Sequence, residues 1–132
     1  MPLSYRIDPD RRLVVTRGNG VLKDHEVFDY QNEVWSRADV AGYDELIDMS
    51  DVTQILLPSI ERLRDLAELS ASMSRGMPPS RLAIVAPDDI AFGLGQMYDM
   101  CRATSAPGLK PVGVFRTMPE ALTWLGIENG LE

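Results

Sequence analysis

The chain contains only one cysteine, Cys101, and one histidine, His25, among its 132 residues. A single cysteine cannot form an intramolecular disulfide, and the two residues together are too few for a zinc site built on thiolates and imidazoles. We therefore expect a protein of a reducing compartment, the cytoplasm, with no metal site and no cofactor. His25 lies in a polar segment and is interpreted as a surface residue.

Basic residues are also scarce, because 13 lysines and arginines stand against 20 aspartates and glutamates and leave a net charge of −7. Such a surface repels phosphate backbones, so we expect no nucleic-acid partner. No apolar run approaches the ~18 consecutive residues that a membrane-spanning helix needs. The first six residues lack the apolar segment of a signal peptide, and we expect neither a secretion signal nor a membrane span.

What the chain does contain is a regular succession of short apolar strands and amphipathic helices. β-branched and apolar runs predict strands at 5–8, 13–17, 45–49, 82–86 and 112–115, with Gly18-Asn19-Gly20 ending an initial hairpin. Apolar residues at steps of three and four predict helices from 24 to about 38, from 58 to about 73, from 90 to about 102 and from 117 to 125. Pro58 fits the first turn of the second helix, and Thr117 with Glu120 forms a capping box at the last.

This order, β-β-α-β-α-β-α-β-α, is typical of an α/β fold. The run at 82–86 (LAIVA) is continuously apolar, which indicates a strand covered on both faces, as in a parallel sheet. Repeated βα units favour right-handed parallel connections. We predict one domain over residues 1–132, with a mixed, mostly parallel sheet of about five strands, an N-terminal antiparallel hairpin and four helices.

Five polar residues near predicted strand ends and helix starts form a candidate site for an anion or a partner. Ser59 lies where free N–H groups and the helix dipole attract an anion, although helix capping is the favoured interpretation. Asp88 and Asp89 follow a strand and open a helix, which is where α/β sheets bind ligands, but both are also good N-caps. Ser50 and Thr53 complete the set, with hydrogen bonds to the local backbone as the alternative.

A run of acidic residues without lysine or arginine occupies positions 39 to 51. Carboxylate oxygens suit a divalent cation, but the spacing matches no cation-binding loop. A solvated edge is therefore the favoured interpretation for its members, Asp39, Asp44, Glu45, Asp48 and Asp51.

The third predicted helix is apolar on more than one side. One stripe consists of Ile90, Leu94, Met97 and Cys101, so Cys101 is interpreted as a core thiol. Gly93 and Gly95 indicate close packing against the sheet or another subunit. Burial within the monomer and a dimer contact are weighed equally, and the candidate interface residues are Phe92, Gly93, Gln96 and Met100.

Three segments resemble a family of small uncharacterised bacterial proteins with a STAS-like fold, the fold of anti-sigma-factor antagonists. They are residues 46–53 (LIDMSDVT), 81–98 (RLAIVAPDDIAFGLGQMY) and 114–126 (VFRTMPEALTWLG), and the opening of the chain is similar too. The resemblance implies a SpoIIAA-like fold over nearly the whole chain. In the antagonists, a strand ending in Asp-Leu-Ser precedes an Asp-Ser-Ser/Thr-Gly loop that a kinase phosphorylates. Here Asp48-Met49-Ser50 matches the strand end, but the loop position reads Leu56-Leu57-Pro58-Ser59.

Three functions fit this sequence. The first is a non-enzymatic regulatory module that binds a protein partner or a second copy of itself, by analogy of fold. The second is a carrier of a small apolar or lipid-like ligand, suggested by seven methionines, by aromatic residues such as Tyr98 and Trp124, and by the likeness of STAS-like domains to CRAL-TRIO lipid carriers. The third is an enzyme using Asp88 or Asp89, for which no catalytic partner is assigned.

Overall fold

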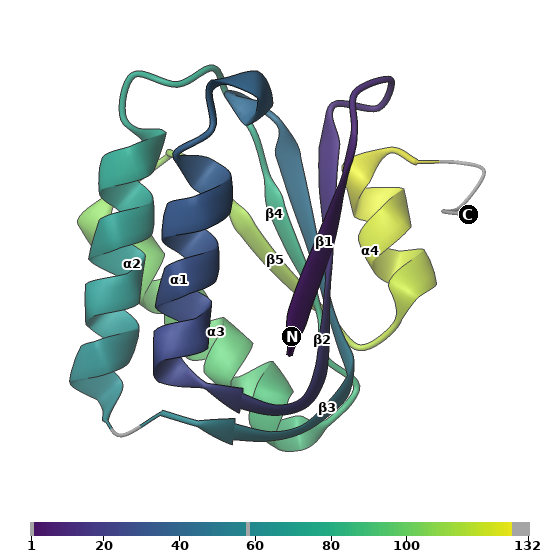
Figure 1. The fold of residues 1–132 in the computed structure, drawn as a ribbon, viewed down its shortest axis with the longest axis vertical. Helices are drawn as coiled ribbons and strands as arrows, with labels where there is room; N and C mark the ends of the chain where they lie inside the picture. The colour runs from purple at the N-terminus through teal and green to yellow at the C-terminus, as the bar shows by residue number, and fades with distance from the viewer. Residues whose placement is uncertain (1, 58, 128–132) are drawn as a thin grey trace.

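The computed structural model describes residues 2–57 and 59–127, and its elements follow the predicted order (Figure 1). The strands are β1 (Leu3–Asp8), β2 (Leu13–Lys23), β3 (Asp44–Leu56), β4 (Leu82–Val85) and β5 (Val112–Phe115). The helices are α1 (Asp24–Trp35), α2 (Ile60–Ser74), α3 (Asp89–Ser105) and α4 (Met118–Leu125), with a 3₁₀ turn, η1 (Ala38–Val40), after α1. Pro58, predicted in the first turn of the second helix, lies outside the described residues.

The five strands form one sheet in the order β1-β2-β3-β4-β5. β1 and β2 pair antiparallel, whereas β2 with β3, β3 with β4, and β4 with β5 pair parallel. A helix connects the two strands of each parallel pair. The predicted α/β fold, a mostly parallel sheet with an N-terminal antiparallel hairpin and four helices, is confirmed.

Three helices cover one face of the sheet, and α4 covers the other (Figure 1). On the face of α1, α2 and α3, Val14 of β2 belongs to the same apolar cluster as Val34 of α1. On the face of α4, Leu46 of β3 clusters with Leu125. β4 is buried over its whole length, as its continuously apolar run predicts, because it lies between both helix layers.

β2 and β3 are longer than predicted. The antiparallel hairpin ends at the predicted glycines, because the last pair of β1 and β2 is Leu3 with Gly18. β2 itself continues to Lys23 and pairs with β3 as far as Leu56. The register shifts between Arg17 and Asn19 and again between Gly20 and Val21. Gly20 has φ of 73°, a left-handed conformation that suits such an irregularity. The predicted end of the hairpin is therefore confirmed, whereas the predicted end of the strand at residue 17 is wrong, because β2 bends at the glycines and continues.

α1 also differs from its prediction at both ends. It ends at Trp35, and Ala38 belongs to the following 3₁₀ turn. At its start the carboxylate of Glu26 accepts a hydrogen bond of 2.9 Å from the backbone N–H of Lys23. Asp24, predicted as the cap, is instead the first helical residue, and its carboxylate is 3.0 Å from Arg62 of α2.

α3 buries a different face from the predicted one. Its buried residues are Ala91, Gly95, Tyr98 and Arg102, whereas Ile90 is 70% exposed and Cys101 is half-buried. A Cβ at Gly95 would lie 3.0 Å from Val114 of β5, so this glycine permits the close packing predicted for it. A Cβ at Gly93 would meet no described atom within 4 Å outside its own helix, so Gly93 does not pack closely within the chain. The buried face of the helix thus includes two small residues, Ala91 and Gly95, while Leu94, Met97 and Cys101 of the predicted stripe are half-buried beside it and only Ile90 is exposed.

Of the capping box predicted for α4, the cap by Thr117 is present, and the Glu120 carboxylate bonds to the Thr117 hydroxyl rather than to its backbone N–H. Thr117 Oγ1 accepts a bond of 3.4 Å from the Glu120 N–H and donates one of 2.9 Å to the Glu120 carboxylate. Gly126 ends the helix in the left-handed region, at φ 77°. Within residues 2–57 and 59–127, no helix has both the length and the apolar character needed to cross a membrane.

Candidate functional site

Five side chains form a buried hydrogen-bonded group, which we call the polar cluster: Thr16, Tyr30, Trp35, Glu45 and Lys110. They come from β2, α1, β3 and the segment just before β5. Glu45 is 3% exposed and Lys110 is 8% exposed. Charged residues are rarely buried to this extent unless they are paired, so the cluster is unusual for a core position.

Glu45 is the centre of the cluster. Its Oε1 lies 2.9 Å from the Lys110 ammonium, and its Oε2 accepts bonds from the Tyr30 hydroxyl at 2.6 Å and from Trp35 Nε1 at 3.0 Å. The Thr16 hydroxyl is 2.7 Å from the Tyr30 hydroxyl. Since Tyr30 uses its own proton to donate to Glu45, Thr16 is the donor in this second hydrogen bond. Both carboxylate oxygens are thus satisfied, which is what a buried charge requires.

Lys110 is held in a constrained position. Its ammonium lies 3.4 Å from the centroid of the Trp35 ring, a cation–π contact in addition to the ion pair with Glu45. Its backbone has φ of 43°, in the left-handed region that non-glycine residues seldom adopt. The packing around Lys110 therefore maintains an unfavourable backbone conformation to keep the ammonium over the ring.

A second buried cation, Arg102 of α3, lies behind the segment that carries Lys110. Its Nη2 donates to the backbone carbonyls of Leu109, at 2.9 Å, and Lys110, at 3.3 Å. Its Nε and Nη1 have no hydrogen-bond partner among the described residues, although Arg102 is only 2% exposed. Of these two buried cations, Lys110 is paired with a carboxylate, that of Glu45, whereas Arg102 bonds only to backbone carbonyls among the described residues.

The polar cluster separates two hollows on the helix face of the sheet. The outer pocket, of about 710 Å³, opens where α1 and α2 end and β3, β4 and β5 begin, and Trp35, Met73 and Lys110 contribute to its wall. The inner cavity, of about 120 Å³, lies between the sheet and α1, α2 and α3, and half of its lining residues are leucine or isoleucine, while Lys23, Asp24 and Glu45 also contribute to its wall. Gln31 of α1 contributes to both walls.

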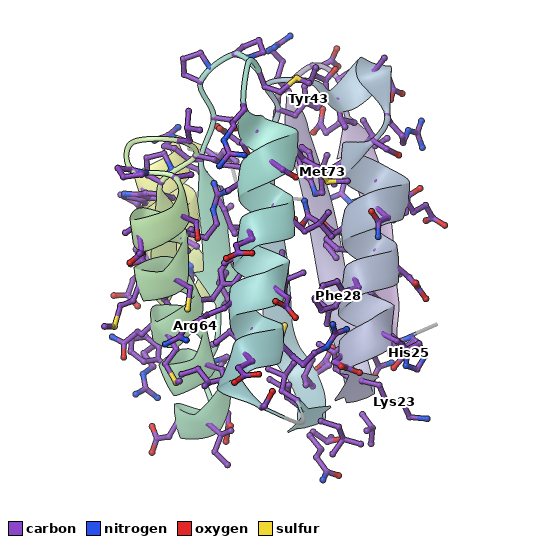
Figure 2. All side chains as sticks on the ribbon, turned by 90° about the vertical axis from the view of Figure 1, so that its left-hand side faces the viewer. Lys23, His25, Phe28, Tyr43, Arg64 and Met73 are labelled. Carbon is purple, nitrogen blue, oxygen red and sulfur yellow. The ribbon has the colours of Figure 1, made fainter. Side chains whose placement is uncertain are left out.

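Gln31 and Met73 meet across the seam between α1 and α2. Gln31 Nε2 is 3.4 Å from the Met73 sulfur, a weak acceptor, and Figure 2 shows Met73 in this seam with Phe28 further along it. Near the other end of the seam the Arg62 guanidinium lies 4.1 Å from the centroid of the Phe28 ring. Side chains of α1 and α2 thus contact one another at both ends of the seam.

Burial perturbs the tyrosines beside the cavity. Desolvation, with the charge of Glu45 and the hydrogen bond to it, raises the pKa of Tyr30 well above its ordinary value. Desolvation likewise raises the pKa of Tyr98 from 10.0 to about 12, although a hydrogen bond with Ser70 and the charge of Arg102 act in the opposite direction. Both hydroxyls are therefore neutral hydrogen-bonding groups at ordinary pH.

The residues predicted as the binding site lie elsewhere. Ser50 and Thr53 belong to the exposed part of β3, where Ser50 Oγ donates to Asp48 at 2.6 Å. Ser59 caps α2 by accepting from the Arg62 N–H at 3.4 Å. In the described part of the chain, no hydrogen bond or ion pair joins the five candidates Ser50, Thr53, Ser59, Asp88 and Asp89 to one another.

Asp88 and Asp89 are both exposed and both engaged locally. Asp88 caps α3 through its Oδ2, which accepts from the Ile90 N–H at 3.0 Å and from the Ala91 N–H at 3.2 Å. Asp89 has a partner that the sequence did not indicate, since its Oδ1 is 2.6 Å from the Arg116 guanidinium. The capping role favoured from the sequence is present for Asp88 and Ser59, and a ligand-binding role for these residues stays a prediction.

The candidate interface residues lie on the outer side of α3. Met100 is 70% exposed and lines a groove of about 400 Å³ between α2 and α3, to which Ile60 and Met97 also contribute. Gln96 is exposed, and Phe92 is half-buried beneath the Arg116 guanidinium, 4.0 Å from its ring centroid. We call Ile60, Met97 and Met100, with Arg64 and Glu68 of the same groove, the α2–α3 face.

The polar cluster was not anticipated from the sequence, which favoured a solvated edge for the acidic run. That interpretation is wrong for Glu45 and for Asp48, which is 7% exposed. A signal was present, because in a strand Glu45 alternates onto the same face as Ile47 and Met49, and a carboxylate on an apolar face needs a partner. Nothing in the sequence indicated Lys110 as that partner.

Replacing Lys110 with Met tests whether the ion pair between Glu45 and Lys110 is buried in the folded protein. Lys110→Met leaves the Glu45 carboxylate unpaired and should lower the free energy of unfolding by about 3–5 kcal/mol, whereas the double variant Glu45→Gln/Lys110→Met should lose clearly less. Urea denaturation measures both. The exposed pair Arg37–Asp39, 2.8 Å apart, is the control, and Arg37→Met should cost less than about 1 kcal/mol. Equal costs for Lys110→Met and Arg37→Met would contradict the structure.

The raised pKa of Tyr98 predicts alkaline destabilisation. Since the folded state holds this proton more tightly than the unfolded chain, its contribution to stability is complete below pH 10 and is lost as the pH rises toward about 12. The urea midpoint should fall across this range, and more shallowly in Tyr98→Phe. An identical fall in both proteins would show that Tyr98 ionises as freely as in the unfolded chain.

Comparison with known proteins supports the fold and goes no further. No family model and no curated protein matches the sequence. Among solved structures, an uncharacterized protein of the DUF3478 family with a SpoIIAA-like fold, from Shewanella loihica PV-4, is similar with a TM-score of 0.56 and 16% identity, over 93% of each chain. The anti-sigma factor antagonist SpoIIAA in its unphosphorylated form is similar with a TM-score of 0.56 and 12% identity, over 94% of this chain and 97% of its own. The resemblance stated from the sequence is confirmed, and the chain has a SpoIIAA-like fold.

Proposed function

We propose that this protein is a non-enzymatic regulatory module that acts by binding another protein through the α2–α3 face. The observation that carries the proposal is the exposure of large apolar side chains there, with Met100 at 70% and Ile60 at 47%. An apolar groove on a chain of net charge −7 is a feature of interaction sites rather than of solvated surface. The SpoIIAA-like fold supports the same role, since one protein of this fold is an anti-sigma factor antagonist.

The partner contacts the module through the groove between α2 and α3. Residues 1–132 act as one domain in the cytoplasm, and the partner is a different protein or a second copy of the chain. A partner's apolar side chain fills the groove between Ile60 and Met100, and the flanking Arg64 and Glu68 pair with opposite charges at the rim. Central apolar anchors contribute most of the affinity in such contacts, while rim charges contribute specificity.

The test compares two methionine substitutions. Met100→Asp places a charge in the groove, and Met77→Asp is the matched control, because Met77 is 48% exposed but lies between α2 and β4. A protein captured by the wild type is purified and titrated against each variant by calorimetry. Met100→Asp should weaken binding at least about tenfold, because the new carboxylate would be buried without a partner in the complex, and Met77→Asp should not. Equal binding by both variants, or no saturable binding, would overturn the proposal.

A second candidate function, the binding of a small apolar ligand, is supported by a separate observation. The inner cavity of about 120 Å³ is lined by apolar side chains of α1, α2, α3 and the sheet. An engineered apolar cavity of about 150 Å³ is large enough to bind benzene. The sequence suggested a small apolar or lipid-like ligand. The volume of the cavity limits that ligand to a molecule about the size of a single benzene ring.

Filling the cavity tests this second function. Ala91 of α3 lines the cavity, whereas Ala103 of the same helix is exposed, so Ala91→Leu and Ala103→Leu form a matched pair. Benzene should raise the melting temperature of the wild type and of Ala103→Leu, because it binds only the folded state, and should leave Ala91→Leu unchanged. A melting temperature that benzene does not alter in the wild type would show that the cavity is not a binding site.

A further inference from the structure

The rim of the α2–α3 face carries one positive and one negative side chain. Arg64 and Glu68 both line the groove and lie four residues apart on α2, so they are neighbours one helical turn apart (Figure 2 labels Arg64). Both side chains are exposed. Among the described residues neither of them forms a hydrogen bond or an ion pair, whereas Arg62 of the same helix is 3.0 Å from Asp24. The face thus presents two opposite, unpaired charges beside an apolar groove.

This arrangement of charges is self-complementary. In a two-fold symmetric contact the same surface of both copies meets, so that residue i contacts residue j and j contacts i. If α2 packs antiparallel on α2 of a second copy, with the two-fold axis at a level between Arg64 and Glu68, Arg64 lies opposite the partner's Glu68. The reverse pair forms at the same time. One contact then pairs four charges that the two separate chains leave unpaired.

The net charge of −7 makes two copies of the chain repel each other, but this repulsion does not fall on the α2–α3 face. The charged residues that line its groove are Arg64 and Glu68, whose charges sum to zero. By contrast, the hollow between β1 and α1 is lined by Glu26, Asp29 and Glu33 and by no lysine or arginine, so it would repel its own copy. The α2–α3 face is therefore better suited to a second copy than that hollow.

The apolar part of the face sets how strong such a contact can be. Ile60 is 47% exposed and Met100 is 70% exposed, and both would leave water on association. α2 has 15 residues and α3 has 17. Two neighbouring helices of this length, each about 10 Å wide, offer a contact of on the order of 500 Å² per copy. A standard stable interface buries about 800 Å² per partner, so the contact should be weak and reversible.

We propose that the α2–α3 face binds a second copy of this chain, in an antiparallel two-fold contact that pairs Arg64 of each copy with the partner's Glu68. This inference rests on the proposed function, protein binding through this face, and names the partner. Ile60 and Met100 are the apolar anchors at the centre, and the paired rim charges fix the orientation of the two copies. Because the contact is small, the dimer dissociates on dilution.

Charge reversal at the two rim positions tests the inference. Sedimentation equilibrium of the wild-type chain from about 1 μM to about 1 mM covers the range expected of a weak dimer. The apparent mass should rise with concentration from 14.7 kDa toward twice that value. Arg64→Glu and Glu68→Arg should each weaken association at least about tenfold, because each places like charges opposite one another twice per dimer. The double variant Arg64→Glu/Glu68→Arg should recover the wild-type affinity within about threefold.

Recovery in the double variant is specific to a symmetric dimer, because a different protein would keep its own charges and would be repelled at both positions. Glu33→Arg on α1 is the control, since Glu33 is exposed and outside the groove and the change in net charge equals that of Glu68→Arg. This control should associate as the wild type does. The melting temperature of each variant checks that it folds.

The failure of this inference can be told from the failure of the proposed function. A wild-type chain that stays monomeric over the whole range would overturn the inference, while the comparison of Met100→Asp with Met77→Asp against a captured protein still decides the proposed function. A dimer that tolerates both single reversals forms through another surface and would also overturn it. So would a dimer that the single reversals weaken and the double reversal does not restore.

Discussion

The ion pair between Glu45 and Lys110 is the contact on which the arrangement of the helix face depends. It joins residues 65 positions apart, one near the start of β3 and one just before β5, with β4 between those strands. The pair is stable in the interior only because Tyr30 and Trp35 occupy the second oxygen of the carboxylate and the Trp35 ring faces the ammonium. The carboxylate thereby orients α1 against the sheet as well as linking two strand ends.

The same contact divides the space under the helices. On one side of it lies the open outer pocket, and on the other lies the apolar inner cavity. α3 relates this interior to the surface, because its buried face carries Tyr98 and Arg102 and its outer face carries Met100. The two proposed functions therefore use opposite sides of α3. The ligand would bind in the cavity on its inner side, and the protein partner would bind on its outer side.

Much of the fold could be predicted from local patterns. The continuously apolar run of β4, the cap that Thr117 provides for α4, and the order of strands and helices all reflect interactions within a few residues of one another. The predictions for the end of β2 and the buried face of α3 were wrong because each depends on a contact with another strand. Gly18 and Gly20 would end an isolated hairpin, but pairing with β3 carries β2 past them. α3 turned its small residues inward because β5 approaches at Gly95.

At the candidate site, the sequence determined the character of single segments, and the tertiary structure decided which side chains meet. The sequence by itself determined the strand periodicity that puts Glu45 on an apolar face, the net charge, and the single thiol and imidazole, which exclude an intramolecular disulfide and a zinc site built on thiolates and imidazoles. Only the tertiary structure decided that Lys110 neutralises Glu45, that Arg102 has no counter-ion among the described residues, and that two hollows meet at Gln31. The physical reason is that periodicity and capping arise from neighbours along the chain, whereas burial and the pairing of buried charges arise from segments that only the completed sheet brings together.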